Sequence, residues 1–195
     1  MKHLIRIFST TNYKGTRNYI DSQKKYEVIR TLLYFGISAS LFIAGYIATK
    51  TKVNYLTVIA VVGCLPASKS LIGAIMFFRY KSCSKEMCQR LDKTNNQLTE
   101  LYDMVFTSYD KNFPIAHMVI AGNTICGYTE SEKYDDKAFQ MHIANVLKLD
   151  GHKNTTVKIF TDPDKYIDRI VQLNHSEADT SNSASIAATL KSVVL

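Results

Sequence analysis

The chain has 195 residues and a formal net charge of +7, which is divided unevenly along its length. Residues 1–93 carry 15 Lys and Arg against 4 Asp and Glu, whereas residues 94–195 carry 9 against 13. A nucleic-acid-binding domain needs a basic face, so the mildly acidic second half excludes DNA or RNA as the expected partner. The four cysteines form no C-x-x-C pair, which predicts structural thiols rather than a disulfide framework.

Residues 1–30 are predicted to form a cytoplasmic N-terminal segment. Residues 1–8 alternate basic and apolar side chains, a pattern typical of a short amphipathic segment on a membrane surface or of a frayed terminus. Residues 23–30 are expected to begin a helix that continues into the first apolar run.

Two apolar runs, residues 31–49 and 56–78, dominate the first half of the chain. The first run has 19 residues without a charge, and the second has 23 residues with one charge, Lys69. About 20 apolar residues cross the roughly 30 Å hydrocarbon core of a bilayer as a helix. The polar tip at 50–54 is long enough only to reverse the chain, so we predict a transmembrane helical hairpin over 31–78. The alternative is a buried helical hairpin of a soluble protein.

The flanks of this hairpin are basic. Residues 11–30 and 79–98 carry five Lys and Arg each, whereas the tip carries two. Positively charged flanks stay on the cytoplasmic side, so we expect an inner (plasma) membrane protein with both termini in the cytoplasm. Because anionic lipid attracts each cation by about 1 kcal/mol, a bilayer with anionic headgroups is an expected partner.

Small residues recur at helical spacing in both runs. Such residues let helix backbones approach closely in lipid, where packing rather than the hydrophobic effect drives association. We predict that the two stripes face each other within one chain; a homo-oligomer that uses the same stripes is the alternative. The stripes are Gly36, Ser40, Ala44 and Ala48 in the first run, and Ala60, Gly63, Ala67, Ser70 and Ala74 in the second.

The second run contains three further residues of interest, Pro66, Lys69 and Ser70. A proline removes a helix hydrogen bond and kinks the span, and serine hydroxyls can satisfy the freed carbonyl. An intramembrane lysine is a candidate functional group. Three interpretations of Lys69 stay open: its stem snorkels to the cytoplasmic surface, it contacts a lipid or a subunit, or it serves transport.

Residues 79–106 are predicted to form a juxtamembrane connector helix, since apolar residues recur at roughly helical spacing from Met87 to Val105. Pro114 is expected to end this helical region. Residues 176–195 are predicted to be a polar linker and a C-terminal tail. The last ten residues are either a loose tail or a docked terminal helix.

Residues 107–175 are predicted to form a small cytoplasmic α/β domain of order β-β-α-β-α, which makes the chain an α+β membrane protein. Gly122 and Asn123 suit a tight hairpin turn between the first two strands. The second and third strands are expected to be parallel and joined by a right-handed crossover. The predicted strands are 115–121, 124–129 and 155–161, and the predicted helices are 135–149 and 163–173.

Two acidic loops follow strands of this domain. Ligands of open α/β units bind beyond the carboxyl ends of the strands, where carboxylates can hold a divalent ion. The simpler interpretation of the second loop is helix capping, because Asp162 precedes Pro163 and Asp164 at a helix start. The candidate residues for a ligand or ion site are Glu130, Glu132, Asp162 and Asp164.

Enzyme signatures are absent from the sequence. It contains no Walker loop, no G-x-G-x-x-G and no G-x-S-x-G. His117 and His142 are interpreted as core or surface histidines, and His152 and His175 lack a recurring ligand spacing. We therefore expect no catalytic residues, no cofactor and no bound metal.

Three stretches resemble those of two-span bacterial membrane proteins with a small cytoplasmic α/β domain, for which no activity is known. The resemblance covers most of the chain up to about residue 173. It implies a source of the anaerobic Gram-positive type and brings no activity, cofactor or site. The stretches are Leu65-Pro66-Ala67-Ser68-Lys69-Ser70, Phe106-Thr107-Ser108-Tyr109-Asp110-Lys111-Asn112-Phe113 and Asn123-Thr124-Ile125-Cys126-Gly127.

Three hypotheses follow for function. The first is a non-enzymatic membrane anchor that presents a protein-interaction or regulatory module, which binds an unknown protein or a second copy. The second is a membrane-tethered, metal-dependent hydrolase that uses the acidic loops. The third is an oligomeric pore or transporter subunit built on Lys69.

Overall fold

The computed structural model describes residues 13–94, 97–109, 111–131, 134–152, 154–175 and 182–195. Two long apolar helices come first, followed by a four-stranded mixed sheet with helices. The described residues divide into two compact units. The hairpin unit holds Ile20–Lys81, and the sheet unit holds residues 13–19 and Ser82–Leu195.

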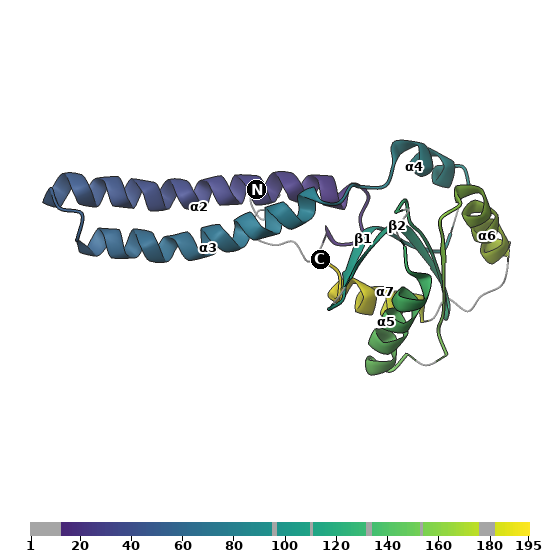
Figure 1. The fold of residues 1–195 in the computed structure, drawn as a ribbon. Coiled ribbons are helices and arrows are strands. Elements are labelled where there is room, and N and C mark those ends of the chain that lie inside the picture. The colour runs from purple at the N-terminus through teal and green to yellow at the C-terminus, as the bar shows by residue number, and fades with distance from the viewer. Residues whose placement is uncertain (1–12, 95–96, 110, 132–133, 153, 176–181) are drawn as a thin grey trace. The chain divides into compact units, whose positions relative to one another are not determined.

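The hairpin unit consists of α2 (Tyr19–Thr49) and α3 (Tyr55–Phe78), which run side by side in opposite directions (Figure 1). Helix α2 begins four residues before the predicted start. Asn54 closes the tip: its side chain accepts a hydrogen bond from the Thr57 N–H at 2.9 Å and donates one to Thr49 Oγ1 at 3.1 Å. Each helix is long and apolar enough to cross a membrane, judged by length and composition.

The sheet unit contains one mixed sheet of order β1-β2-β3-β4. The strands β1 (Thr99–Thr107), β2 (Asn112–Ala121) and β3 (Thr124–Tyr128) are antiparallel, and β4 (Thr156–Phe160) runs parallel to β3. The crossover between β3 and β4 contains α5 (Asp136–Leu149). Ala121 pairs with Thr124, so Gly122 and Asn123 make the predicted two-residue turn, with Gly122 at a φ of 57°. The β-β-α-β-α order is confirmed.

The connector helix predicted over 79–106 is wrong in its second half. A short helix, α4 (Lys85–Asp92), is followed by β1, which adds a fourth strand to the predicted three. Every residue from Leu101 to Phe106 is buried, because helices cover both faces of the sheet here. A strand buried on both faces shows no alternation of polar and apolar residues, and Leu98, Leu101 and Val105 imitate a helical period.

Helices cover the two faces of the sheet in pairs (Figure 1). One face packs on α5 and α7 (Ser183–Ser192), and the other packs on α4 and α6 (Pro163–His175). Ile186 and Leu190 of α7 are fully buried against the first face. Of the two interpretations of the C-terminus, the docked helix is therefore confirmed, and the loose tail is wrong for residues 183–192.

The outer edge of β1 is covered by chain from both ends of the sequence. The Tyr102 N–H donates to the Gly15 carbonyl at 3.0 Å, and the Leu195 N–H donates to the Val105 carbonyl at 3.1 Å. Pro114 lies within β2 rather than ending a helix. It is tolerated because β3 has already ended at this level, so β2 pairs there with β1 alone.

Candidate functional site

The contact face of α2 is polar. Gln23, Glu27, Thr31 and Ser38 are each less than one-tenth exposed. The opposing face of α3 carries small residues, with Ala60, Ala67, Ser70 and Ala74 buried. The stripe predicted for the second run, which includes Gly63 and Ala67, is therefore placed correctly on the contact face.

The stripe predicted for the first run does not face α3, and its use in a homo-oligomer stays a prediction. Gly36, Ser40 and Ala44 are exposed, and a Cβ built on Gly36 would meet no atom within 4 Å. The face of α2 that contacts α3 instead carries residues spaced seven apart. A Cβ on Gly45 would lie 2.6 Å from Asn54 Oδ1 and 2.8 Å from Leu56 Cβ. A four-residue spacing of small side chains was thus a weaker signal than the polar residues Thr31 and Ser38, which lie seven apart on the same face.

A polar cluster occupies the open end of the hairpin. We name Gln23, Glu27, Arg30 and Ser70 the hairpin cluster. Ser70 Oγ donates to Glu27 Oε2 at 2.9 Å, and both Gln23 Nε2 and Arg30 Nη1 donate to Glu27 Oε1 at 3.1 Å. The Glu27 side chain is 8% exposed, so these three donors satisfy a carboxylate that is withdrawn from solvent. The sequence interpretation missed the cluster because Glu27 and Arg30 precede the apolar run.

The hairpin contacts also define where Lys69 lies. Ser38 packs on Gly63, and Gly45 packs on Leu56. In both pairs the two residue numbers have the same sum, which gives the register of α2 against α3. By this register Ser70 falls opposite Thr31, the first residue of the uncharged run. Lys69 is exposed beside this level, and Pro66 lies inside α3 on an exposed position. Ser68 Oγ donates a hydrogen bond to the Cys64 carbonyl at 2.8 Å. Pro66 leaves a different carbonyl without its helix hydrogen bond, so Ser68 does not compensate for the proline.

The predicted acidic site is dispersed among structural contacts. Asp162 accepts hydrogen bonds from the Asp164 N–H at 2.9 Å and the Lys165 N–H at 3.4 Å, which confirms its predicted capping of α6. These bonds lower the pKa of the Asp162 carboxyl. Asp164 pairs with Arg90 of α4. Across the described ranges, no group of three or more His, Cys, Asp or Glu is arranged to hold a metal ion.

Glu130 has a different role. It accepts a hydrogen bond from the Ser84 N–H at 3.2 Å, immediately before α4. Glu132, the fourth predicted residue, lies outside the described residues. The acidic loops therefore contact α4 at two points, through Glu130 and Asp164, and the ion-site hypothesis stays a prediction.

The chain that leaves α3 is bound to the sheet at Asp103. The Cys83 N–H donates to Asp103 Oδ1 at 2.8 Å, and Asp103 is 1% exposed with a φ of 54°. A non-glycine residue rarely adopts this left-handed conformation inside a strand, and the β1–β2 pairing is interrupted there. Cys83 also contacts Cys88 across the first turn of α4. An apolar contact of this kind, between the residue before the N-cap and one in the first turn, often accompanies a capped helix start. Burial raises the pKa of the Cys83 thiol, in keeping with the predicted structural thiols.

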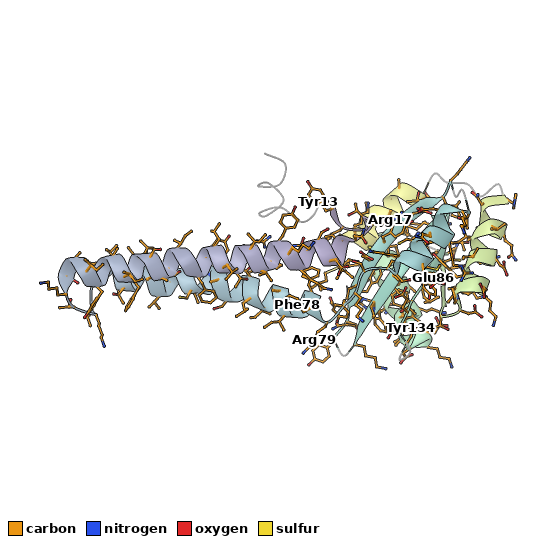
Figure 2. The ribbon with its side chains drawn as sticks, turned by 90° about the horizontal axis from the view of Figure 1, so that it is seen from above. Tyr13, Arg17, Phe78, Arg79, Glu86 and Tyr134 are labelled. Atoms are coloured by element: carbon orange, nitrogen blue, oxygen red, sulfur yellow. The ribbon has the colours of Figure 1, made fainter. Side chains whose placement is uncertain are left out.

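The segment that precedes α2 is bound to Tyr102, the residue of β1 next to Asp103. Besides the Gly15–Tyr102 backbone bond, Arg17 donates to both carboxylate oxygens of Asp92, at 3.1 and 2.6 Å, and to the Tyr102 hydroxyl at 3.1 Å. These contacts raise the pKa of the Arg17 guanidinium. Tyr102 and Asp103 thus hold the segments that immediately precede α2 and follow α3. Arg17, itself part of the sheet unit, is labelled in Figure 2.

A buried polar chain extends from Tyr102 across the sheet. The Tyr102 hydroxyl donates to Glu100 Oε2 at 3.1 Å, and the Tyr102 ring contacts the His117 ring at a centroid distance of 4.4 Å. His117 Nδ1 lies 2.9 Å from the Tyr166 hydroxyl of α6. Burial, together with the nearby Arg17 charge, lowers the pKa of His117 to about 3, so the imidazole is neutral at pH 7. Burial raises the pKa of Tyr102 to about 12.

Comparisons with protein-family models, with curated proteins and with solved structures find no match to this chain.

Proposed function

We propose that the chain is an integral membrane protein whose hairpin anchors a small, non-enzymatic binding or regulatory module at the cytoplasmic face of the plasma membrane. The hairpin is α2 with α3, and the module is the sheet unit. The observation that carries the proposal is the outer surface of the hairpin.

Between residues 31 and 78 that surface is mostly apolar. Large apolar side chains of both helices are between 39% and 91% exposed, and Figure 2 shows them projecting outward along the whole hairpin. Soluble monomers rarely expose a contiguous apolar patch larger than a few hundred Å², whereas lipid makes such a surface favourable. Among the exposed side chains are Leu32, Ile37, Ile43 and Ile47 of α2, and Val58, Val62, Leu65 and Ile72 of α3.

The helix contact fits the same environment. Lipid offers no hydrophobic drive between helices, so close packing of small residues and hydrogen bonds between helices provide the association. The hairpin supplies both, through Gly45 and Gly63 and through the bond of Ser70 to Glu27. A soluble helical hairpin buries large apolar residues at its contact and exposes polar ones, which is the opposite arrangement.

The attachment of the sheet unit supports a regulatory or interaction role. The segments on either side of the hairpin are held by Tyr102 and Asp103, two consecutive residues of β1. Both segments therefore contact the same strand, and the Tyr102 ring also contacts His117, which lies beside Tyr166. We expect the partner to be a protein or a second copy of the chain.

Thiol labelling on intact cells tests the anchor and its orientation. Lys52→Cys in the tip and Tyr109→Cys in the sheet unit place an accessible thiol in each, since both positions are exposed and the native cysteines are buried or half-buried. A membrane-impermeant maleimide should label Lys52→Cys on intact cells, and Tyr109→Cys only after permeabilisation. Labelling of both variants on intact cells would contradict the orientation.

Size measurement after detergent extraction tests the binding role. The proposal expects the purified full chain to elute as a complex with a second copy or with a protein that remains bound. A strict monomer that retains no protein would contradict it.

A further inference from the structure

The Arg30 guanidinium makes hydrogen bonds within the hairpin through only one of its three nitrogens. Its Nη1 donates to Glu27, whereas Nε and Nη2 are buried and have no hydrogen-bond partner. The Arg30 side chain is 18% exposed. Buried donors without acceptors cost free energy, and guanidinium groups in folded proteins are normally paired, so this arrangement indicates a missing acceptor.

The two free nitrogens define the shape of that acceptor. Nε and Nη2 lie on the same side of the planar guanidinium and point their N–H groups in parallel. This pair matches two oxygens of one phosphate or carboxylate, which it binds with two charge-assisted hydrogen bonds. A single water molecule or backbone carbonyl oxygen can accept from both donors, but it adds no attraction between opposite charges.

The position of Arg30 in the chain selects a lipid as the source of the oxygens. Arg30 directly precedes the uncharged run 31–49, which is about 28 Å long as a helix and matches the hydrocarbon core. In the proposed topology the guanidinium lies at the level where lipid phosphates begin. The hairpin cluster faces this boundary from both helices, because Ser70 lies opposite Thr31.

The charge around Arg30 selects an anionic lipid. Within residues 20–30 and 79–81, five Lys and Arg stand against two Asp and Glu, which leaves three positive charges. Glu27 neutralises Arg30 only on its Nη1 side, and Asp21 is already paired with Lys24 at 2.9 Å. The excess attracts a headgroup that carries a net negative charge, and the fork of Arg30 fixes its phosphate.

We propose that Nε and Nη2 of Arg30 form a specific site for the phosphate of an anionic phospholipid of the inner leaflet. This inference rests on the membrane insertion proposed above and adds a defined ligand to the general attraction of basic residues for lipid. It also gives the hairpin cluster a function: Glu27, held by Ser70 and Gln23, accepts from Nη1 and leaves Nε and Nη2 for the phosphate.

Native mass spectrometry of the full chain in detergent, with added phosphatidylglycerol or phosphatidylcholine, tests the site. The wild type should retain phosphatidylglycerol at least about tenfold more tightly than phosphatidylcholine. Arg30→Gln should abolish this preference. Arg30→Lys keeps the charge and the pairing with Glu27 but lacks the fork, so it should also lose about tenfold. Arg79→Gln removes one charge from the exposed end of α3 and should weaken the preference far less than Arg30→Gln does.

Each of the following results would overturn the proposal. Equal retention by Arg30→Lys and the wild type would show that charge alone acts. Equal losses in Arg30→Gln and Arg79→Gln would show diffuse attraction. Thermal stabilisation of the wild type by inorganic phosphate, equal to that by phosphatidylglycerol, would assign the site to free phosphate rather than lipid. A chain that fails to float with vesicles contradicts the anchor itself, whereas a chain that floats without lipid preference contradicts only the site.

Discussion

Alanine at Gly45 and alanine at Gly36 should have opposite effects on the hairpin. The two glycines lie on the same helix, nine residues apart, and on different faces. A Cβ on Gly45 would lie 2.6 Å from Asn54 Oδ1 and 2.8 Å from Leu56 Cβ, whereas a Cβ on Gly36 would meet nothing within 4 Å. The pair therefore separates the cost of crowding the helix contact from the intrinsic preference of helices for alanine.

The magnitudes follow from these distances. The Leu56 Cβ is fixed to the backbone, so relief requires α3 to move, and overpacking of this kind costs about 1–3 kcal/mol. The gain from replacing glycine in a helix is about 1 kcal/mol, and it offsets part of that cost. We expect Gly45→Ala to lower the free energy of unfolding by up to about 2 kcal/mol, and Gly36→Ala to leave it unchanged or to raise it by up to about 1 kcal/mol.

Unfolding of the full chain in increasing fractions of sodium dodecyl sulfate measures both variants, with the distance between dyes on α2 and α3 as the signal. Equal destabilisation of the two variants, or a larger loss for Gly36→Ala, would refute the assignment of the α2 contact face. Such a result would return the contact to the stripe of Gly36, Ser40 and Ala44.

Three further predictions concern the sheet unit, measured by denaturant unfolding of the full chain. Asp103→Val should lower the free energy of unfolding by about 2–4 kcal/mol, because it removes the acceptor of the Cys83 N–H and places a β-branched residue at a φ of 54°. Asp103→Asn should lower it clearly less, and equal losses in the two variants would contradict this role of Asp103. Leu190→Ala should cost about 2–5 kcal/mol if α7 is docked, and an unchanged midpoint would contradict that docking. His117 is neutral in the fold and binds a proton in the unfolded chain below pH 6.5, so stability should fall by up to about 1.4 kcal/mol per pH unit from pH 6.5 toward pH 3. His117→Gln should flatten that slope, and an identical slope would contradict the assignment.

The sequence predicted the elements whose patterns have one explanation. The two long apolar runs predict long helices. The order of strands and helices after Pro114 is predicted by turn residues, helix caps and the change in the spacing of apolar residues. Asp162 before Pro163 identified the start of α6 correctly, since side-chain capping is a local effect.

The failures have a common physical cause, which is contact with a distant segment. β1 is buried between two layers of helices, so its own sequence shows neither alternation nor a polar face, and its pattern predicts a helix instead. The C-terminal helix is weakly patterned alone and is fixed by Ile186 and Leu190 against the sheet.

The hairpin cluster was missed for the same reason. Glu27 and Arg30 resemble ordinary flanking charges in the sequence, and only the approach of Ser70 from α3 shows that they are buried. The acidic residues were grouped by their place after strands, whereas Glu130 and Asp164 each contact α4, a neighbour that the strand order does not specify.

Separation of membranes after an alkaline carbonate wash, followed by flotation of the full chain on a density gradient, tests the central claim most directly. The outward apolar surface of α2 and α3 predicts that the chain stays in the pellet after the wash and rises with the vesicles. Recovery of the full chain in the supernatant, folded and free of lipid, would contradict the anchor and with it the lipid site at Arg30.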